Sequence, residues 1–356
     1  MENLYKYTTA EQQIQKLKSQ HLSFDDEKKA TTILKTYGYY NIINGYRDPY
    51  ITREYGNKTY NPDVTFEQIF ALFVFDHNIR NAILLSMIDL EEHLKAVVAD
   101  IISESFGSNH EDYLNKNNYR DKKVNDPKFS RNNILSGMVH VAEHSQAQPI
   151  KYYRESKKII PPWILLKGIY FGTLVNYIRF FKAPQRDRII KTLYSGQVTE
   201  TNMGELKDLL SDTLFMCLEY RNLAAHGGRV YNYTPKSSIR ALSEENTRTK
   251  RGLPQLLFAL SFFYYSQPYS RLERSLNKSL NDYCHAYMND IQRIEKTTGL
   301  EITVENHVWV NEKTQKYHTN PHCSGSKDCK NITLKEATEL NYIPCKKCCK
   351  DIIPVA

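Results

Sequence analysis

The sequence lacks the two features that mark secreted and membrane proteins. Its first residues, MENLYKYTTAEQQIQ, contain no basic segment followed by an apolar run, so we expect no signal peptide. The most apolar later stretch, LPQLLFALSFFYYS, is about 14 residues long, which suits a buried core helix and is too short to cross a bilayer. We therefore expect a soluble, cytoplasmic protein with no membrane partner.

Cysteine is spread too unevenly for a disulfide framework. Two of the seven cysteines, Cys217 and Cys284, stand alone in helical patterns. The other five crowd into a short C-terminal stretch: Cys323, Cys329, Cys345, Cys348 and Cys349. This asymmetry favours a local metal site over disulfides along the whole chain.

The sequence has no large excess of either charge. It contains 48 Lys and Arg against 40 Asp and Glu, which is a formal net charge of +8. This balance favours an anionic partner but does not identify one. The 26 tyrosines offer surfaces on which bases can stack, although most tyrosines are simply half-buried. A nucleic-acid function therefore has to be argued from particular residues.

Strand-forming patterns are scarce before residue 303, so the body of the chain is predicted to be all-helical. Between Phe66 and Ser105 there is no Gly or Pro, and apolar residues recur at helical spacing. Thr65 and Gln68 form a capping-box pattern at the start of this stretch. The pattern predicts one long spine helix, which Gly107 ends. Further helical patterns cover residues 8–47, 161–182, 204–226, 253–267 and 271–296.

Two polar segments interrupt the helical patterns. Residues 53–64 are expected to form a polar turn. Residues 109–131 contain few aliphatic side chains and are expected to be a mobile insertion.

The character of the chain changes near residue 300. Residues 307–318 read as two short strands around a polar turn, and residues 332–342 as a short helix with a second capping box. At 356 residues the chain is long for one core. We therefore expect a mainly helical domain of residues 1–300 and a small α+β module of residues 301–356.

The C-terminal module carries a pattern typical of a zinc site. His318 and Cys323 precede the short helix, and Cys345-Lys-Lys-Cys348 follows it. A C-x-x-C turn directs two thiolates at one centre, and a second pair at the end of a hairpin completes a tetrahedron suited to zinc. Four protein ligands leave no open position, so we expect a structural zinc that supplies the folding energy of a segment with few large aliphatic residues.

The choice of the four ligands stays open at this point. His322 or Cys329 can replace His318, and Cys349 is interpreted as a spectator. The alternative to a metal site is a tail with reduced thiols. The spacing of the module, YH-x4-C, a short helix and PC-x-x-C, resembles small cysteine-rich zinc modules that are appended to many bacterial enzymes.

A second candidate site lies at the end of a helical pattern, in EYRNLAAHGGRVYN. Arg221 follows an apolar stripe, Asn222 and His226 are four residues apart, and two glycines end the helix. The structural interpretation is that His226 interacts with the helix dipole and that Arg221 pairs with a buried acid such as Asp76 or Asp89. The functional interpretation is a metal-independent nuclease, in which His226 transfers a proton and Arg221 stabilises the transition state. A spacing of five residues does not place Arg221 and His226 on one face of an ideal helix.

Four segments in order carry a resemblance to a known family: YGYYNIINGYRDPY, TFEQIFALFVFDHNIRNAILLSMIDLEEHLKAVVADIISESFG, PPWILLKGIYFGTLVNYIRFFK and YRNLAAHGGRVYN. Together they resemble the Abi family of abortive-infection proteins, of the AbiD/AbiF type, over roughly residues 8 to 300. The stretch RNLAAH also has the R-x4-H form of HEPN ribonucleases. Relatives commonly read AHH or AHN at this point, so Gly227 departs from the pattern and leaves the pair intact.

The resemblance implies a HEPN-like helical bundle with an antiphage role, which acts on RNA as a homodimer that brings two copies of Arg221 and His226 together. By position, the family pattern assigns the catalytic pair to Arg221 and His226 and the adjacent polar position to Asn222. Arg229 and Tyr231 are candidates for contacting a phosphate or stacking on a base. Support from the spine helix is expected from Asp76, Arg80, Glu91 and Glu92.

Two other functions remain open from the sequence. In the first, the protein binds RNA without cleaving it, for example a small noncoding RNA, and Arg221 and His226 only hold phosphate. In the second, the zinc module binds DNA as part of a regulator, although its basic residues are interspersed with acidic ones. An antitoxin partner is also compatible with an abortive-infection protein.

Overall fold

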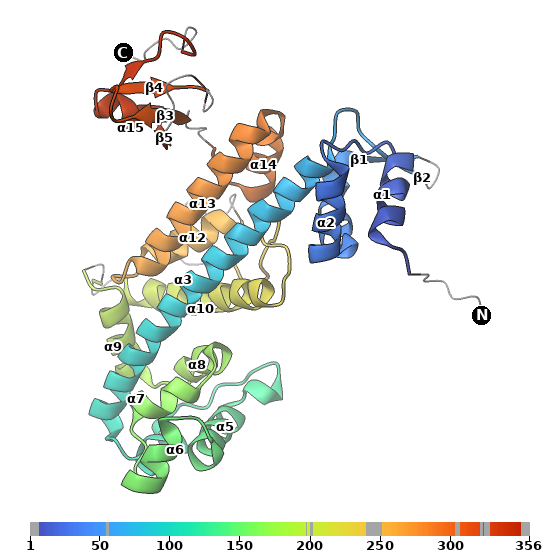
Figure 1. Ribbon diagram of the computed structural model, residues 1–356. Helices are drawn as coiled ribbons and strands as arrows, with labels where there is room; N and C mark the ends of the chain where they lie inside the picture. Colours follow the sequence, from blue (N-terminus) through green and yellow to red (C-terminus); the bar gives the residue numbers. More distant parts are fainter. Residues whose placement is uncertain are drawn as a thin grey trace, which may run out of the picture. The chain divides into compact units, whose positions relative to one another are not determined.

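The computed structural model describes residues 7–54, 57–196, 198–199, 202–239, 251–302, 307–320, 323 and 328–349. The chain divides into two compact units, of which the first comprises Met1–Asn277 with Lys296–Leu300, and the second Lys278–Glu295 with Glu301–Ala356. Helices dominate the described residues, and a small sheet lies near the C-terminus (Figure 1). The mainly helical fold predicted from the sequence is therefore confirmed.

The first unit is built around the predicted spine helix α3, Phe66–Phe106. Its N-cap is Thr65, whose side chain accepts a hydrogen bond from the backbone N–H of Gln68 at 3.2 Å. It ends at Gly107, whose φ of +82° suits a residue without a Cβ. Helix α10, Met203–Ala225, packs against α3 (Figure 1). By length and composition α3 can cross a membrane, but half of its most apolar window is buried inside the protein, as in a core helix.

The remaining helices before residue 300 are three to 20 residues long, and the last two lie partly in the second unit. They are α1 Ala10–Ser19, α2 Glu27–Tyr37, α4 His110–Tyr113, α5 Arg131–His144, α6 Ile150–Tyr152, α7 Pro162–Leu165, α8 Phe171–Ile178, α9 Ala183–Leu193, α12 Leu253–Ser261, α13 Gln267–Ala286 and α14 Ile291–Thr298. Single turns of 3-10 or π-helix lie between them: η1 Tyr40–Asn44, η2 Asp48–Tyr50, η3 Lys116–Asn118, η4 Pro127–Phe129, η5 Tyr153–Lys157, η6 Leu166–Gly168 and η7 Met288–Asp290. Two helical patterns in the sequence, 161–182 and 271–296, are thus each divided into several pieces.

The polar turn expected at residues 53–64 is partly a β-hairpin. Strands β1, Ile51–Glu54, and β2, Asn57–Tyr60, pair antiparallel with Ile51 opposite Tyr60. The prediction missed it because the strands have no alternating apolar pattern, although the Tyr60 ring is buried. The prediction of an all-helical body before residue 303 was therefore wrong for this short hairpin.

The prediction of a mobile insertion at residues 109–131 is also wrong. Tyr113 and Tyr119 are 0% and 2% exposed, and the Tyr113 hydroxyl donates to the carbonyl of Ile160 at 2.7 Å. Tyr119 also forms an isolated antiparallel bridge with Phe181. Two buried aromatic rings anchor the segment in place of the aliphatic side chains that it lacks.

The C-terminal sheet contains four strands in the order β5-β3-β4-β6. Strand β3, His307–Asn311, pairs antiparallel with β4, Lys316–His318, on one side and with β5, Lys330–Thr333, on the other. Strand β6, Ile343–Pro344, is parallel to β4. Helix α15, Leu334–Glu339, begins with the predicted capping box between Thr333 and Glu336. The predicted hairpin and short helix are confirmed. We call the described residues from 307 to 349 the sheet module.

Candidate functional site

The end of α10 forms a Schellman motif that exposes His226. The N–H of Gly228 donates to the carbonyl of Leu223 at 2.9 Å, and the N–H of Gly227 to that of Ala224 at 3.2 Å. Gly227 has a φ of +71°, which explains a glycine at this position. His226 is the C-cap residue, with a φ of −93° and a ψ of 12°, and its side chain is exposed. The helix end is thus non-ideal at the residue where the sequence predicted a catalytic His.

The chain that follows α10 is fixed by a buried carboxylate of the spine helix. Asp76 is 0% exposed, and its Oδ1 accepts hydrogen bonds from the backbone N–H of Val230 at 2.9 Å and of Tyr231 at 2.8 Å. Its Oδ2 accepts from the hydroxyl of Tyr46 at 2.6 Å. Burial raises the pKa of Asp76, whereas these hydrogen bonds and the charge of Arg80 lower it and leave part of the increase. Asp76 therefore ties three segments that are distant in the sequence.

Arg80, one turn along α3, holds the glycine carbonyl beside His226. Its Nη1 donates to the carbonyl oxygen of Gly227 at 2.8 Å, and its Nε lies 3.8 Å from the Asp76 carboxylate. Its Nη2 lies 3.1 Å from Nδ1 of His77. Because a guanidinium only donates, Nδ1 of His77 is the acceptor, and the proton of the neutral imidazole is on Nε2. Arg80 thus orders both the helix end and a second imidazole.

These side chains line a pocket with a volume of about 550 Å³. His77, Arg80, His226 and Arg229 contribute to its wall, together with Tyr40, whose side chain is 76% exposed. Two imidazoles, two guanidinium groups and an open aromatic ring are the groups that an RNA backbone and its bases can engage. Asp76 and Arg80 were expected here from the sequence, whereas His77 and Tyr40 were not. His77 lies between Asp76 and Arg80 in FDHNIR, and this cluster of polar residues in an apolar helix was the available signal.

Arg221 and Asn222 do not line this pocket. Arg221 is half-buried on α10, and its Nη1 donates to Oδ1 of Asn222 at 3.2 Å. The buried-acid pairing considered for Arg221 is not present, because Asp76 pairs with Arg80 and Asp89 pairs with Arg271. Within the described part of the chain, no carboxylate forms an ion pair with Arg221. The structure therefore places His226 in the pocket and Arg221 outside it.

Arg229 and Tyr231 have different surroundings. Arg229 is exposed at the pocket, and its Nη1 donates to the carbonyl of Gly45 at 2.6 Å. Tyr231 is 3% exposed, and its ring stacks on Tyr46 with 6.1 Å between ring centroids. A buried ring cannot stack on a base, so the contact expected of Tyr231 does not fit its position. Its backbone N–H, bound to Asp76, instead fixes the pocket wall.

The other two acidic residues considered on the spine helix do not reach the pocket. Glu91 pairs with Lys95 at 2.7 Å on the same helix, and Glu92 is exposed. Of the four spine residues, only Asp76 and Arg80 have direct contacts with the end of α10.

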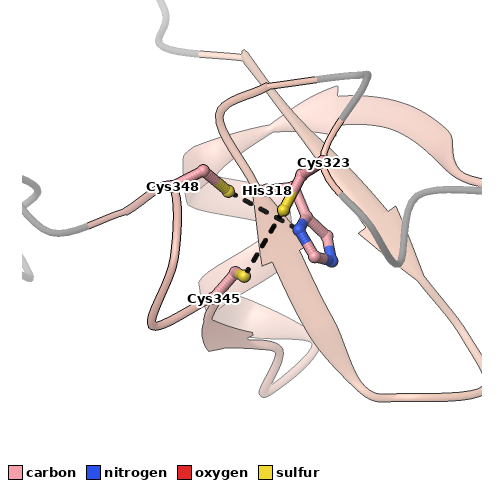
Figure 2. Close-up of side chains that lie close together, drawn as sticks. All are labelled: His318, Cys323, Cys345 and Cys348. Carbon is pink, nitrogen blue, oxygen red and sulfur yellow. Dashed lines mark hydrogen bonds between the residues drawn. The ribbon is translucent and has the colours of Figure 1, made fainter.

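The sheet module gathers the four residues expected to be metal ligands. One ligand atom from each of His318, Cys323, Cys345 and Cys348 lies within 4.8 Å of all the others, and Figure 2 shows the four side chains converging. The parallel pairing of β6 with β4 causes this, because the N–H of Cys345 donates to the carbonyl of Tyr317 at 2.9 Å. His318 at the end of β4 therefore lies beside the C-x-x-C turn that follows β6.

The spacing of the donor atoms fits a tetrahedral metal ion. With Zn–S near 2.3 Å and Zn–N near 2.0 Å, neighbouring ligand atoms are about 3.5–3.8 Å apart. Sγ of Cys323 and Sγ of Cys345 are 3.9 Å apart, and Sγ of Cys348 is 3.5 Å from Nδ1 of His318. Burial raises the pKa of Cys348, but hydrogen bonds from the backbone of Asn320 and Thr319 outweigh it and lower that pKa to about 6. A thiolate is the form that binds a metal.

The structure treats the three other candidate ligands, Cys329, His322 and Cys349, differently. Cys329 is not part of the cluster, and His322 lies outside the described residues. Cys349 is buried, with its Sγ 3.4 Å from the carbonyl of Tyr317. The cluster can hold a metal ion and is compatible with structural zinc.

A model of the protein family described as Abi-like protein matches residues 32–232 of the chain. The match covers more than half of the 356 residues and includes the spine helix, the pocket and the end of α10. It ends before the sheet module begins. Comparisons with curated proteins and with solved structures give no match.

Proposed function

The chain belongs to the Abi-like protein family, and from this premise we propose that it is an AbiD/AbiF-type protein that defends a cell against phage by cleaving RNA. The family suggests abortive infection. The HEPN-type nuclease activity is our proposal, and the observation that carries it is the pocket at the end of α10. There, two imidazoles, His77 and His226, lie among cationic groups able to hold phosphate.

The proposed reaction needs only groups of this chain. The ribose 2'-oxygen attacks the adjacent phosphorus, and the bond to the 5'-oxygen of the next nucleotide breaks. His226 takes the proton of the 2'-hydroxyl and gives it to the departing 5'-oxygen. In this proposal Arg80 and Arg229 bind the phosphate, and their guanidinium groups stabilise the charge that develops on it. The products are a 2',3'-cyclic phosphate and a free 5'-hydroxyl.

Arg221 and Asn222 enter the proposal through a second copy of the chain. Both lie outside the pocket, and no carboxylate in the described residues neutralises Arg221. In a homodimer that joins two α10 ends, Arg221 of each copy would face the RNA held beside His226. This arrangement also removes the difficulty that a five-residue spacing presents on one helix.

The test compares histidine variants in an RNA cleavage assay that contains EDTA. His226→Ala should reduce the rate about 100- to 10,000-fold, because it removes a proton-transfer group. The control is His140→Ala, which removes an exposed histidine of α5 that does not line the pocket and should cleave like the wild type. Products are identified by their cyclic phosphate ends. Cleavage by His226→Ala at the wild-type rate would exclude the assignment.

The second candidate function is RNA binding without cleavage, supported by the same cationic wall. It predicts salt-dependent retention of RNA, such as a small noncoding RNA, with no cleavage products in any condition. Sequencing the RNA that copurifies with wild type and with His226→Ala separates the two. Cleavage predicts that intact target RNA accumulates only on the variant, whereas binding alone predicts the same RNA on both.

For the sheet module we propose zinc as the bound ion. Three sulfurs and one imidazole nitrogen form a donor set that zinc prefers, and four protein ligands give it a structural role. When bound, the ion would hold the turn after β6 against the end of β4. DNA binding by the module has no comparable support from its described residues.

A further inference from the structure

A second cavity lies away from the pocket at the end of α10. It has a volume of about 410 Å³ and shares no lining residue with that pocket. Its walls come from residues 120–122 and from helices α8, α9 and α10. This volume is within the range of small-molecule sites, which is about 300–1,000 Å³.

The polar wall of this cavity is strongly cationic. Arg120, Arg179 and Arg186 all line it. Lys207 lines it as well but is already paired with Asp187 at 2.8 Å. Burial lowers the pKa of Arg120, and the nearby charges of Arg186 and Arg179 lower it further. Within the described residues, none of the three forms an ion pair.

Hydrogen bonds to uncharged groups hold Arg120 and Arg179 in place without neutralising them. Arg120 follows the bridge between Tyr119 and Phe181, and its Nε donates to the carbonyl of Arg179 at 2.9 Å. Arg179 donates from Nη1 to Oδ1 of Asn176 at 2.9 Å. Nε of Arg186 is buried and has no hydrogen-bond partner in the described part of the chain. Each guanidinium carries five N–H donors, so most remain for a ligand.

Another part of the lining is apolar and includes an aromatic ring. It consists of Val175, Ile178, Ile190, Leu210, Leu214 and Phe215. The guanidinium of Arg179 lies over the ring of Phe215, 5.1 Å from its centroid. The lining therefore has cationic and apolar side chains next to each other. Asp208 is the acidic residue of the lining, and it is exposed.

We propose that this cavity binds a free nucleotide, with its phosphate on Arg120, Arg179 and Arg186 and its base against the apolar wall near Phe215. Arginine forks match phosphate oxygens in pairs, and planar bases pack on aromatic and apolar surfaces. A single nucleotide fits the enclosed volume better than a continuous strand does. The proposal is independent of any cleavage at the α10 pocket.

The test is calorimetric titration of the full chain with AMP and ADP, with adenosine and inorganic phosphate as partial ligands. AMP or ADP should bind, and adenosine should bind at least about tenfold more weakly because it lacks the charge-assisted contacts. Arg186→Gln should weaken AMP or ADP binding about tenfold. The matched control is Arg188→Gln on the same helix, whose guanidinium pairs with Glu104 and lies outside the cavity. This control should leave the affinity unchanged.

Phe215→Leu provides a second variant, which keeps α10 helical but removes the ring and should also weaken AMP or ADP. Circular dichroism melting establishes that each variant is folded, and if Arg186→Gln is not, Phe215→Leu decides. No heat of binding with AMP or ADP at millimolar concentration would overturn the proposal. So would equal affinity of the wild type and the folded variants. Displacement of AMP by a single-stranded RNA that Arg186→Gln weakens equally would instead make the cavity part of an RNA path.

Discussion

In the helical body, the spine helix α3 is covered by aliphatic and aromatic side chains along almost its whole length. The buried set of the sheet module is far smaller. It consists of Val308, Val310, Tyr317, Ala337, Cys345 and Cys349. Each large apolar side chain contributes about 1.5–3 kcal/mol when it is fully buried, so four apolar residues cannot offset the conformational entropy of the module. The body can fold by burial, whereas the module needs another source of free energy.

The two regions also differ in the role of their buried polar groups. In the body, a buried carboxylate such as Asp76 is surrounded by donors from three segments, and it positions the pocket wall. In the module, the polarisable groups are thiols that face one another at metal-binding distances. A polar group in the body therefore arranges a site that packing already supports. In the module, a metal ion held by the polar cluster would be the main support.

The largest expected effect follows from breaking the metal cluster. Cys345→Ser should release the bound metal and unfold the module, because a structural zinc supplies about 10–16 kcal/mol in small domains at pH 7. The melting transition of the body should stay where it is. Metal content per chain and limited proteolysis within residues 307–349 measure the effect.

The matched control for that variant is Cys329→Ser, which removes a thiol of the same module outside the cluster. It should retain one metal ion per chain and the proteolysis pattern of the wild type. A module that resists proteolysis equally in Cys345→Ser and in the presence of a strong chelator would show that burial alone is sufficient there.

The next effect tests the body through its buried carboxylate. Asp76→Ala leaves the Tyr46 hydroxyl and the N–H groups of Val230 and Tyr231 without their acceptor, and it leaves Arg80 without its ion-pair partner. We expect a loss of about 3–5 kcal/mol in the free energy of unfolding, because breaking a buried charged network is costly. Urea denaturation, followed by the far-UV circular dichroism of the helices, measures the free energy of unfolding.

Asp100→Ala on the same helix is the control, since Asp100 is exposed. It should change the free energy of unfolding by no more than about 0.5 kcal/mol. If the two variants lose the same stability, Asp76 does not fix the segment after α10, and the description of the pocket wall is wrong.

The elements that the sequence predicted well have local signals. The spine helix was readable from its unbroken apolar spacing and from the caps at Thr65 and Gly107. The strands β3 and β4 and the capping box at Thr333 were readable for the same reason. Elements anchored by single aromatic residues were not. The segment around Tyr113 and Tyr119 looked mobile because its partners, Ile160 and Phe181, are more than 40 residues away.

The two candidate sites also differ in how far local sequence patterns predict them. The four residues of the candidate metal cluster could be named from the sequence because C-x-x-C spacing and a hairpin largely determine their geometry, although His322 and Cys329 stayed open as replacements for His318. The α10 pocket could be named only in part. His226 was identified, but the contact of Arg80 with Gly227 joins residues 147 positions apart, and no local pattern encodes it. Tyr231 was expected to contact RNA because its burial depends on Tyr46, which is even more distant in the chain.

The smallest expected effect concerns the loop that follows the pocket, and it depends on pH. Glu219 on α10 accepts hydrogen bonds from the N–H of Lys236 at 2.7 Å, the N–H of Ser237 at 2.8 Å and the hydroxyl of Tyr233 at 2.9 Å. Burial raises the pKa of Glu219, but these hydrogen bonds outweigh it and lower the pKa below 4.5. A carboxyl whose pKa is lower in the folded than in the unfolded state stabilises the protein at pH values above its unfolded pKa. This contribution is lost as the pH falls through the folded pKa.

Glu219→Gln should therefore cost about 1 kcal/mol at pH 7 and less as the pH falls below 4.5, because only the wild type has an ionised carboxylate to lose. Glu205→Gln, an exposed position on the same helix, should parallel the wild type at every pH. Melting temperatures of the body between pH 3 and 7 measure the difference. A gap between wild type and Glu219→Gln that stays constant over this range would show that the body holds the loop by burial alone, as it holds its helices.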